Sequence, residues 1–195
     1  MKLTLLLLGL AAQAFAQKHE LGFTIGRLIE NDRGLVRSQS GTALQFNYGY
    51  RFWTNSSVAL SGEVHMLASP LRDVSGGSGA TRDYASLYLT PGIRVKLNPE
   101  GRIQPYGAVG GGYALYEHST QTIGGAQNQA PRHIHRGALM YGAGLDVPIA
   151  RWLALRGEIR DFYTGNPAYF GGGGGGFSGG GQHNIVAGGG FVLRF

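Results

Sequence analysis

Three side chains of the kinds found in hydrolases lie at alternate positions of the chain: Ser61, Glu63 and His65. A serine nucleophile needs an imidazole within hydrogen-bond reach, and that imidazole needs a third group to orient it. Alternating apolar residues around the three predict a strand, in which residues two apart are separated by about 7 Å, so Ser61 and His65 lie roughly 13 Å apart. Ser86 could approach His65 from a neighbouring strand, but the sequence leaves that register open. We therefore expect no enzyme, with a lipid-modifying hydrolase or acyltransferase as the alternative.

Three other histidines, His118, His133 and His135, could supply imidazole ligands to a metal. The last two share a face of an extended chain, and a nearby third ring could complete a site. However, the chain has no cysteine, no clustered carboxylates accompany the rings, and their spacing matches no established zinc pattern. We expect solvated loop histidines, and no metal or other cofactor.

A glycine-rich segment at residues 171–181 matches the spacing of a phosphate-binding loop only because it is almost entirely glycine. It has neither the strand–turn–helix context nor the following Lys-Ser/Thr of such loops. The formal charge of +6 comes from Lys and Arg residues that are scattered singly, unlike the clustered patches of nucleic-acid-binding proteins. We expect an exposed loop here and no nucleic-acid partner.

The first sixteen residues have the three parts of a secretory signal peptide. Lys2 is the positive start, residues 3–10 are the apolar centre, and residues 14–16 (Ala-Phe-Ala) form a small-x-small cleavage site. The apolar run is too short for a membrane-spanning helix, which needs about 20 residues. We therefore predict cleavage of residues 1–16 and a single mature domain over residues 17–195.

The mature sequence divides into eight segments in which apolar and polar residues alternate, at 20–28, 42–52, 58–68, 84–97, 103–116, 137–147, 153–163 and 184–195. Residues i and i+2 share a face of a strand, so each segment has one apolar and one mixed face. In the second segment Leu44, Phe46 and Tyr48 share one face, whereas Gln45 and Asn47 share the other. The pattern predicts an all-β fold.

Segment lengths and connections distinguish a membrane barrel from a soluble sandwich. Ten or eleven residues at about 3.3 Å each, tilted near 40°, cover roughly 25 Å, the height of the apolar band of a bilayer. Connections of five residues alternate with connections of 13 to 20 residues, as in barrels with short periplasmic turns and long external loops. The sequence therefore predicts an eight-stranded antiparallel up-and-down transmembrane β-barrel, with external loops at 29–41, 69–83, 117–136 and 164–183.

The inward register of three strands collects ionisable side chains: Glu63, His65, Arg94, Arg156, Glu158 and Arg160. The interior of an eight-stranded barrel is just wide enough for side chains to fill, and an unpaired buried ion costs several kcal/mol. We expect these six residues to form a polar network that closes the lumen. Arg51, Lys96, Asp146 and Arg194 fall near the periplasmic rim, where we expect them to be hydrated.

Aromatic residues mark the two predicted membrane interfaces. The only two tryptophans, Trp53 and Trp152, fall at short turns with Phe52 at the same level, as in a periplasmic aromatic girdle. The outer girdle is predicted to include Tyr84, Tyr113 and Tyr163.

Two charges and one proline test the lipid-facing register. Arg27 and Asp161 are its only charged residues, and both fall near the external strand ends, where a charge costs about 0–1 kcal/mol. Pro91 lies inside a strand of a closed barrel and has no N–H to donate. We expect a bulge or a widened gap in the hydrogen-bond ladder at that position.

The C-terminal residues Phe191-Val192-Leu193-Arg194-Phe195, with segments 104–110 and 155–160, carry a family resemblance. Over its whole mature length the chain resembles the small bacterial outer-membrane β-barrels typified by OmpA- and OmpX-like domains. The resemblance implies that Phe191, Leu193 and Phe195 form the signal recognised by the barrel-assembly machinery. Because functions vary widely within this family, the resemblance implies a fold and a location rather than an activity.

Together these observations predict a bacterial outer-membrane protein that contacts outer-membrane lipids. Its function would be envelope structure or contact with a surface partner that the sequence does not identify. The alternatives are the lipid-modifying enzyme and a conduit for small apolar molecules. Glycines 110–112 leave room for a gap in the wall, but the charged interior argues against an apolar lumen.

Overall fold

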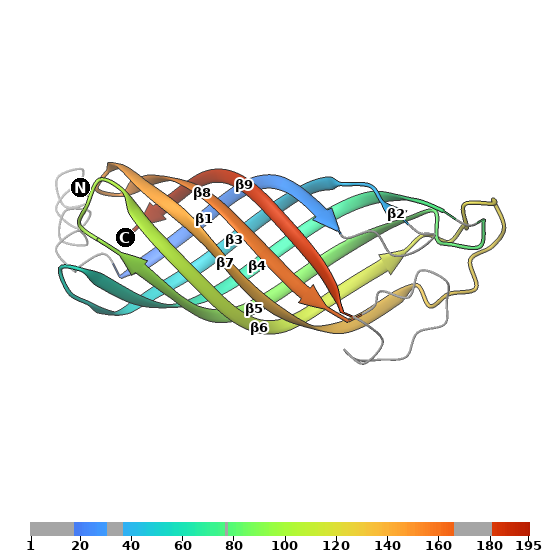
Figure 1. The fold of residues 1–195 in the computed structure, drawn as a ribbon, viewed down its shortest axis with the longest axis horizontal. Helices are drawn as coiled ribbons and strands as arrows, with labels where there is room; N and C mark the ends of the chain where they lie inside the picture. The colour runs from blue at the N-terminus through green and yellow to red at the C-terminus, as the bar shows by residue number, and fades with distance from the viewer. Residues whose placement is uncertain (1–17, 31–36, 77, 166–180) are drawn as a thin grey trace, which may run out of the picture.

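The computed structural model describes residues 18–30, 37–76, 78–165 and 181–195. Within them lie eight long strands and one two-residue strand (Figure 1): β1 (His19–Glu30), β2 (Arg37–Ser38), β3 (Gly41–Thr54), β4 (Val58–Ser75), β5 (Asp83–Leu97), β6 (Gln104–His118), β7 (His133–Ala150), β8 (Leu153–Thr164) and β9 (Gln182–Arg194). No helix among the described residues is long and apolar enough to cross a membrane. The signal peptide at 1–16 lies outside the described residues, so its cleavage stays a prediction.

The eight long strands form a closed antiparallel barrel. Each pairs with its neighbours in the chain, β1 also pairs with β9, and β2 pairs with the outer end of β4. His19 and Phe195 exchange backbone hydrogen bonds of 2.9 and 3.0 Å, which complete the seam between the first and last strands. Closure removes the exposed sheet edges that a bilayer would not tolerate. The predicted eight-stranded up-and-down topology is confirmed.

Apolar and polar residues alternate along the sequence, and exposed and buried side chains alternate in the same way along the strands of the structure. In β3, Gln45 and Asn47 are buried, whereas Leu44 before them and Tyr48 after them are 50% and 36% exposed. The same alternation runs along the other long strands, whose exposed large apolar side chains face away from the barrel axis. The apolar face therefore surrounds the barrel and the polar face fills it.

The long connections are shorter than predicted because strand pairing continues beyond the expected ends. β4 continues to Ser75 and β7 begins at His133. Much of the loops expected at 69–83 and 117–136 is therefore strand. The other two expected loops include residues 31–36 and 166–180, which lie outside the described residues, as does most of the glycine-rich segment.

The β4–β5 and β6–β7 connections hold each other in place. The N–H of Arg82 donates to the carbonyl of Gln121 at 3.1 Å, and the N–H of Ile123 donates to the carbonyl of Ala80 at 3.0 Å. Figure 1 shows that these connections project farthest at the end of the barrel opposite the C-terminus. They form an ordered surface at the end where the external loops were predicted.

Pro91 interrupts one ladder without shifting its register. On the β4 side Pro91 still pairs with Val64. On the β6 side pairing stops at Leu89 and resumes at Gly92, with the same register before and after. Because pairs are missing at Thr90 and Pro91, the irregularity is a gap in the hydrogen-bond ladder. A bulge or such a gap was expected because proline has no N–H to donate.

Tyr84 faces the opposite way from its predicted place in the outer aromatic girdle. It is almost completely buried, and its hydroxyl donates to the carboxylate of Glu30 inside the barrel. Its position in β5 places it on the inward face with Ser86 and Tyr88. Tyr113, by contrast, is exposed on the outside.

Candidate functional site

The interior of the barrel contains all six side chains that the inward register selects. Glu63, His65, Arg94, Arg156, Glu158 and Arg160 are each at most 7% exposed. Across the described residues, the buried cations are Arg72, Arg94, Lys96, Arg156, Arg160 and Arg194. The buried carboxylates are Glu20, Glu30, Glu63, Asp146 and Glu158. The two signs nearly balance, which a low-dielectric interior requires.

Glu20 on β1 is the anionic centre of the periplasmic half. Its carboxylate accepts hydrogen bonds from Arg94 Nη2 at 2.6 Å and Lys96 Nζ at 2.8 Å. The guanidinium groups of Arg194 and Arg156 lie 3.5 and 3.8 Å from the same carboxylate. Sequence reasoning did not single out Glu20. Its only signal is a carboxylate at an inward position of the first predicted strand.

Asp146 on β7 is the second anionic centre and corrects an expectation. Arg156 donates two hydrogen bonds to its carboxylate, at 2.7 and 2.9 Å, and Lys96 Nζ lies 2.8 Å away. We expected Lys96, Asp146 and Arg194 to be hydrated at the rim, but all three are buried. Because β7 continues to Ala150, Asp146 lies deeper in the barrel than predicted.

Arg160 joins two carboxylates at the middle of the lumen. Its Nη1 donates to Glu63 at 2.6 Å and its Nε donates to Glu158 at 2.9 Å. Arg94 Nη1 lies 3.2 Å from Glu63, which connects this group to Glu20. The hydroxyl of Tyr106 donates to the same Glu158 oxygen, Oε2, at 2.7 Å. We call the connected set the ion network: Glu20, Glu63, Arg94, Lys96, Asp146, Arg156, Glu158, Arg160 and Arg194.

Two inward-facing glycines make room for the large side chains at this level. A Cβ at Gly49 would lie 2.5 Å from Arg94 Nη2, and one at Gly144 would lie 2.5 Å from the ring of Tyr106. Both distances are much shorter than normal contacts in a close-packed interior. Glycine at these positions is therefore part of the network's geometry.

Among the described residues, one buried carboxylate and several rings lie in the outer half of the lumen. Glu30 accepts hydrogen bonds from Arg72 and from the hydroxyl of Tyr84, and the Arg72 guanidinium lies 4.4 Å from the centre of the Tyr84 ring. The hydroxyls of Tyr88 and Tyr116 are 3.2 Å apart. We call these five residues the tyrosine cluster.

Comparison with known proteins assigns the family. Residues 3–195 match the family model of the outer membrane protein beta-barrel domain. The chain belongs to this family. It is therefore a bacterial outer-membrane barrel, and the apolar face described above contacts lipid. No curated protein matches the chain.

Solved outer-membrane proteins share the fold of this beta-barrel domain. Neisserial surface protein A is 11% identical with a TM-score of 0.60, covering 91% of this chain and 97% of that one. OprG of Pseudomonas aeruginosa is 14% identical with a TM-score of 0.57, covering 92% and 96%. Ail, the attachment invasion locus protein of Yersinia pestis, was solved with the heparin analogue sucrose octasulfate. It is 16% identical with a TM-score of 0.53, covering 92% and 97%. At these identities the likeness establishes the fold alone.

The hydrolase arrangement considered from the sequence does not form in this outer-membrane barrel. His65 pairs with Thr90 across β4 and β5, and its ring lies 5.6 Å from that of Phe162. Neither ring nitrogen of His65 has a hydrogen-bond partner among the described residues. Ser86, the cross-strand alternative, accepts a hydrogen bond from Arg72 at 2.7 Å. No serine hydroxyl is activated by this imidazole.

The three histidines considered as metal ligands lie apart. The expectation that His118 is a solvated loop histidine is wrong, because it ends β6 and is buried inside the barrel, with its ring 6.4 Å from that of Tyr84. His133 and His135 point outward, and His135 shares a hydrogen bond with the Tyr113 hydroxyl. Among the described residues, no three potential metal ligands of the His, Cys, Asp or Glu type gather in one place.

The sequence assigns six further residues to membrane anchoring or assembly: Phe52, Trp53, Trp152, Phe191, Leu193 and Phe195. All lie on the outer face, and every aromatic among them is about half exposed. Phe195 also stacks on His19, with ring centres 5.6 Å apart, at the seam of the barrel. The roles of these residues as girdle and assembly signal stay predictions.

Proposed function

We propose that this outer-membrane protein is a closed, non-catalytic barrel that presents an ordered surface for contact outside the cell. The observation that best supports closure is the ion network, which joins side chains of β1, β4, β5, β7, β8 and β9 across the lumen. A continuous water path would have to separate several of these pairs. Removing one partner of a buried pair typically costs about 3–5 kcal/mol, so the paired state is strongly favoured.

The same contacts argue against an active site in the lumen. Glu63 binds Arg160 and Glu158 binds both Arg160 and Tyr106, so neither carboxylate is available to orient an imidazole. We expect Glu63→Gln and His65→Phe to leave the acylation profile of lipid A unchanged when the variants replace the wild-type protein in cells. A changed profile would favour the lipid-modifying alternative.

The clamped external connections support a role at the cell surface. Ala80 and Thr81 are fully buried although they lie beyond the strand ends, and Ile123 packs against the hydrophobic cluster that includes Ala80. A surface held in one conformation loses little conformational entropy on binding. Solved proteins of this fold include an attachment invasion locus protein and a surface protein, and we extend such a role to this chain as a proposal.

Single-channel recording in planar bilayers tests closure. We expect no stable conductance from the wild-type protein, because charged side chains fill the lumen. The matched control is Arg94→Ala with Arg156→Ala, which removes two of the side chains that cross the periplasmic half. A leak from the control shows that the assay detects an opened lumen, whereas a stable large conductance from the wild-type protein would overturn the proposal.

Replacing residues 121–127 by a Gly-Ser segment of equal length tests the external surface. This change removes the tip of the β6–β7 connection and leaves the long strands intact. We expect attachment of the bacteria to host cells to fall to the level of a deletion strain, while entry of a hydrophobic dye stays normal. Normal attachment together with increased dye entry in the deletion strain would favour envelope structure instead.

One observation supports a second candidate function, a conduit for small apolar molecules. This observation is the gap in the β5–β6 hydrogen-bond ladder. Between Leu89 and Gly92, β5 and β6 share no ladder pairs. Leu89→Cys with Tyr113→Cys introduces the only two thiols of the chain at directly paired positions. If oxidation of this pair blocks uptake of octane and reduction restores it, the conduit is supported. Uptake that is the same with and without the disulfide argues for the closed barrel.

A further inference from the structure

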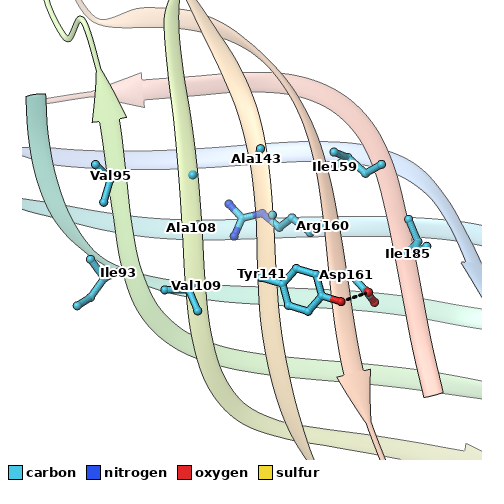
Figure 2. A pocket seen from close by; sticks show the side chains of 12 residues that line it. Ile93, Val95, Ala108, Val109, Tyr141, Ala143, Ile159, Arg160, Asp161 and Ile185 are labelled. Atoms are coloured by element: carbon cyan, nitrogen blue, oxygen red, sulfur yellow. Dashed lines mark hydrogen bonds between the residues drawn. The ribbon is translucent and has the colours of Figure 1, made fainter. Parts of the chain in front are cut away.

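A groove of about 650 Å³ runs over the lipid-facing side of β5 to β9 (Figure 2). Its floor is low because Gly107 and Ala143, which pair across β6 and β7, both face outward with little or no side chain. Apolar walls rise on either side from Ile93, Val109 and Ile159. Because the outer face of this barrel lies in a membrane, the molecule that meets the groove is a lipid.

Tyr141 and Asp161, which line this groove, form a polar cluster with His183 of the adjoining hollow, which shares Val109 and Tyr141 with the groove. Lipid-facing surfaces rarely contain such a cluster. The Tyr141 hydroxyl donates to Asp161 Oδ2 at 2.6 Å, and His183 Nδ1 lies 2.6 Å from the same oxygen. The backbone N–H of Asn184 donates to Asp161 Oδ1 at 3.2 Å. Since a carboxylate only accepts hydrogen bonds, His183 donates from Nδ1 in this pair, and its side chain is 40% exposed. Figure 2 shows Tyr141 and Asp161 side by side at the edge of the groove.

The position of the cluster along the strands places it in the outer leaflet. Asp161 lies close to Thr164, where β8 ends, at the end of the barrel with the long connections. That level is the junction between the acyl chains and the head groups. A groove for an acyl chain and a hydrogen-bonding group at the chain–head junction are therefore adjacent.

A second groove on the same outer face has no such polar cluster among the described residues that line it. A hollow in the barrel wall therefore does not by itself bring polar side chains together. This groove, of about 540 Å³, lies over β1, β3, β4 and β9. Its outward-facing walls include Phe23, Leu44 and Met66, with Ala68 and Gly189 as low points. The polar residues that line it, Thr24 and Gln45, face the lumen and bind each other there.

We propose that the first groove is a binding site for an acylated sugar lipid of the outer leaflet. One acyl chain lies over Gly107 and Ala143, and a hydroxyl or amide at the junction with the sugar hydrogen-bonds His183 Nε2. The Asp161 carboxylate would repel a phosphate placed directly against it. The only cationic side chain lining the groove, Arg160, directs its guanidinium inward to Glu63 and Glu158. The chemistry therefore favours sugar hydroxyls and amides over a phospholipid head group.

Native mass spectrometry of the purified protein with added lipids tests the proposal. The probes are hexa-acylated lipid A, the same lipid after removal of its phosphates, and phosphatidylglycerol. We expect one molecule of lipid A to be retained with an apparent Kd about tenfold below that of phosphatidylglycerol, the range of one or two net hydrogen bonds. We expect dephosphorylated lipid A to be retained equally.

Three variants separate the groove from the rest of the surface. His183→Leu and Ala143→Phe each change a lipid-facing side chain and should abolish the roughly tenfold preference. Ala68→Phe fills the second groove and should leave the preference unchanged. Heat-dependent mobility on gels verifies that each variant is folded. Equal retention of lipid A and phosphatidylglycerol by the wild-type protein would overturn the proposal. So would loss of binding on dephosphorylation, or a preference that survives in both His183→Leu and Ala143→Phe.

Discussion

The two halves of the barrel interior fill the same narrow lumen with polar side chains, but they do so differently. In the periplasmic half each carboxylate serves several cations: Glu20 contacts Arg94 and Lys96, and Asp146 contacts Arg156 and Lys96. In the outer half the single carboxylate of the tyrosine cluster binds one guanidinium and one phenol, and buried tyrosine rings pack beside this pair.

This difference changes what a single substitution removes. A shared carboxylate cannot be lost without taking one partner from more than one buried cation, and a buried charge that is incompletely compensated carries a large penalty. A tyrosine contributes mostly apolar ring surface and one polar atom, so its hydroxyl can be lost at modest cost. Stability should therefore depend on charge in the ion network and on volume in the tyrosine cluster.

The largest expected effect belongs to Glu20→Ala. It removes the carboxylate that accepts hydrogen bonds from Arg94 and Lys96. Glu63 and Asp146 are then left to compensate these two cations as well as the other guanidinium groups that they already contact. We expect the free energy of unfolding in lipid vesicles, measured by urea titration, to fall by about 3–5 kcal/mol. The exposed Glu100 in the β5–β6 turn provides the control, because its replacement by alanine should change stability by less than about 0.5 kcal/mol. A loss below about 1 kcal/mol at Glu20 would show that the network is not shared as described.

A smaller effect is expected from Glu30→Gln in the tyrosine cluster. The amide keeps the shape of the side chain and one accepting oxygen for Tyr84, but it no longer neutralises Arg72. Because Arg72 retains Ser86 and the Tyr84 ring as partners, we expect a loss of about 1–3 kcal/mol in the same urea titration. A loss as large as that of Glu20→Ala would remove the distinction between the two halves.

The sequence was sufficient for the fold because the controlling signals are local. Alternation with a period of two assigns each residue to the inner or outer face, and short and long connections set the topology. The same rule selected Glu63 on β4 and Arg160 on β8, which then meet in the structure at 2.6 Å.

The rest of the interior could not be predicted from the sequence. The depth of a side chain in the barrel, and whether it faces inward or outward beyond a bulge, depend on how distant strands pair. The pairing of β4 with β5 shifts between Ser69 and Arg72. This irregularity moves even-numbered residues of β4 from the outer to the inner face, as bulges do, and so brings Arg72 to Glu30. Similarly, the burial of Asp146 depends on how far β7 extends, which no local pattern near that residue specifies.

A third substitution, Tyr116→Phe, isolates one hydroxyl of the tyrosine cluster. The hydroxyl lies 3.2 Å from that of Tyr88 and 2.7 Å from that of Thr164, while the ring fills buried volume that phenylalanine would also fill. We expect a loss of about 1 kcal/mol in the urea titration. Tyr50→Phe on the lipid-facing side of β3 is the control and should have little effect. If Tyr116→Ala cost no more than Tyr116→Phe, the dependence on volume would be wrong.

The smallest effect is expected where an ion pair lies outside the barrel. Arg132 Nη2 is 2.7 Å from Glu117 Oε1, as close as many pairs of the ion network, but the two side chains are 63% and 42% exposed. Exposed pairs contribute about 0–1 kcal/mol, and salt shortens the screening length from about 10 Å at 0.1 M to about 3 Å at 1 M. We therefore expect Glu117→Gln to cost less than about 0.5 kcal/mol at low salt and nothing measurable at 1 M NaCl. The cost of Glu20→Ala should persist at both salt concentrations, because Glu20, Arg94 and Lys96 are buried and buried pairs are screened much less than exposed ones. If salt reduced both costs equally, the interior would be hydrated and the closed lumen would be untenable.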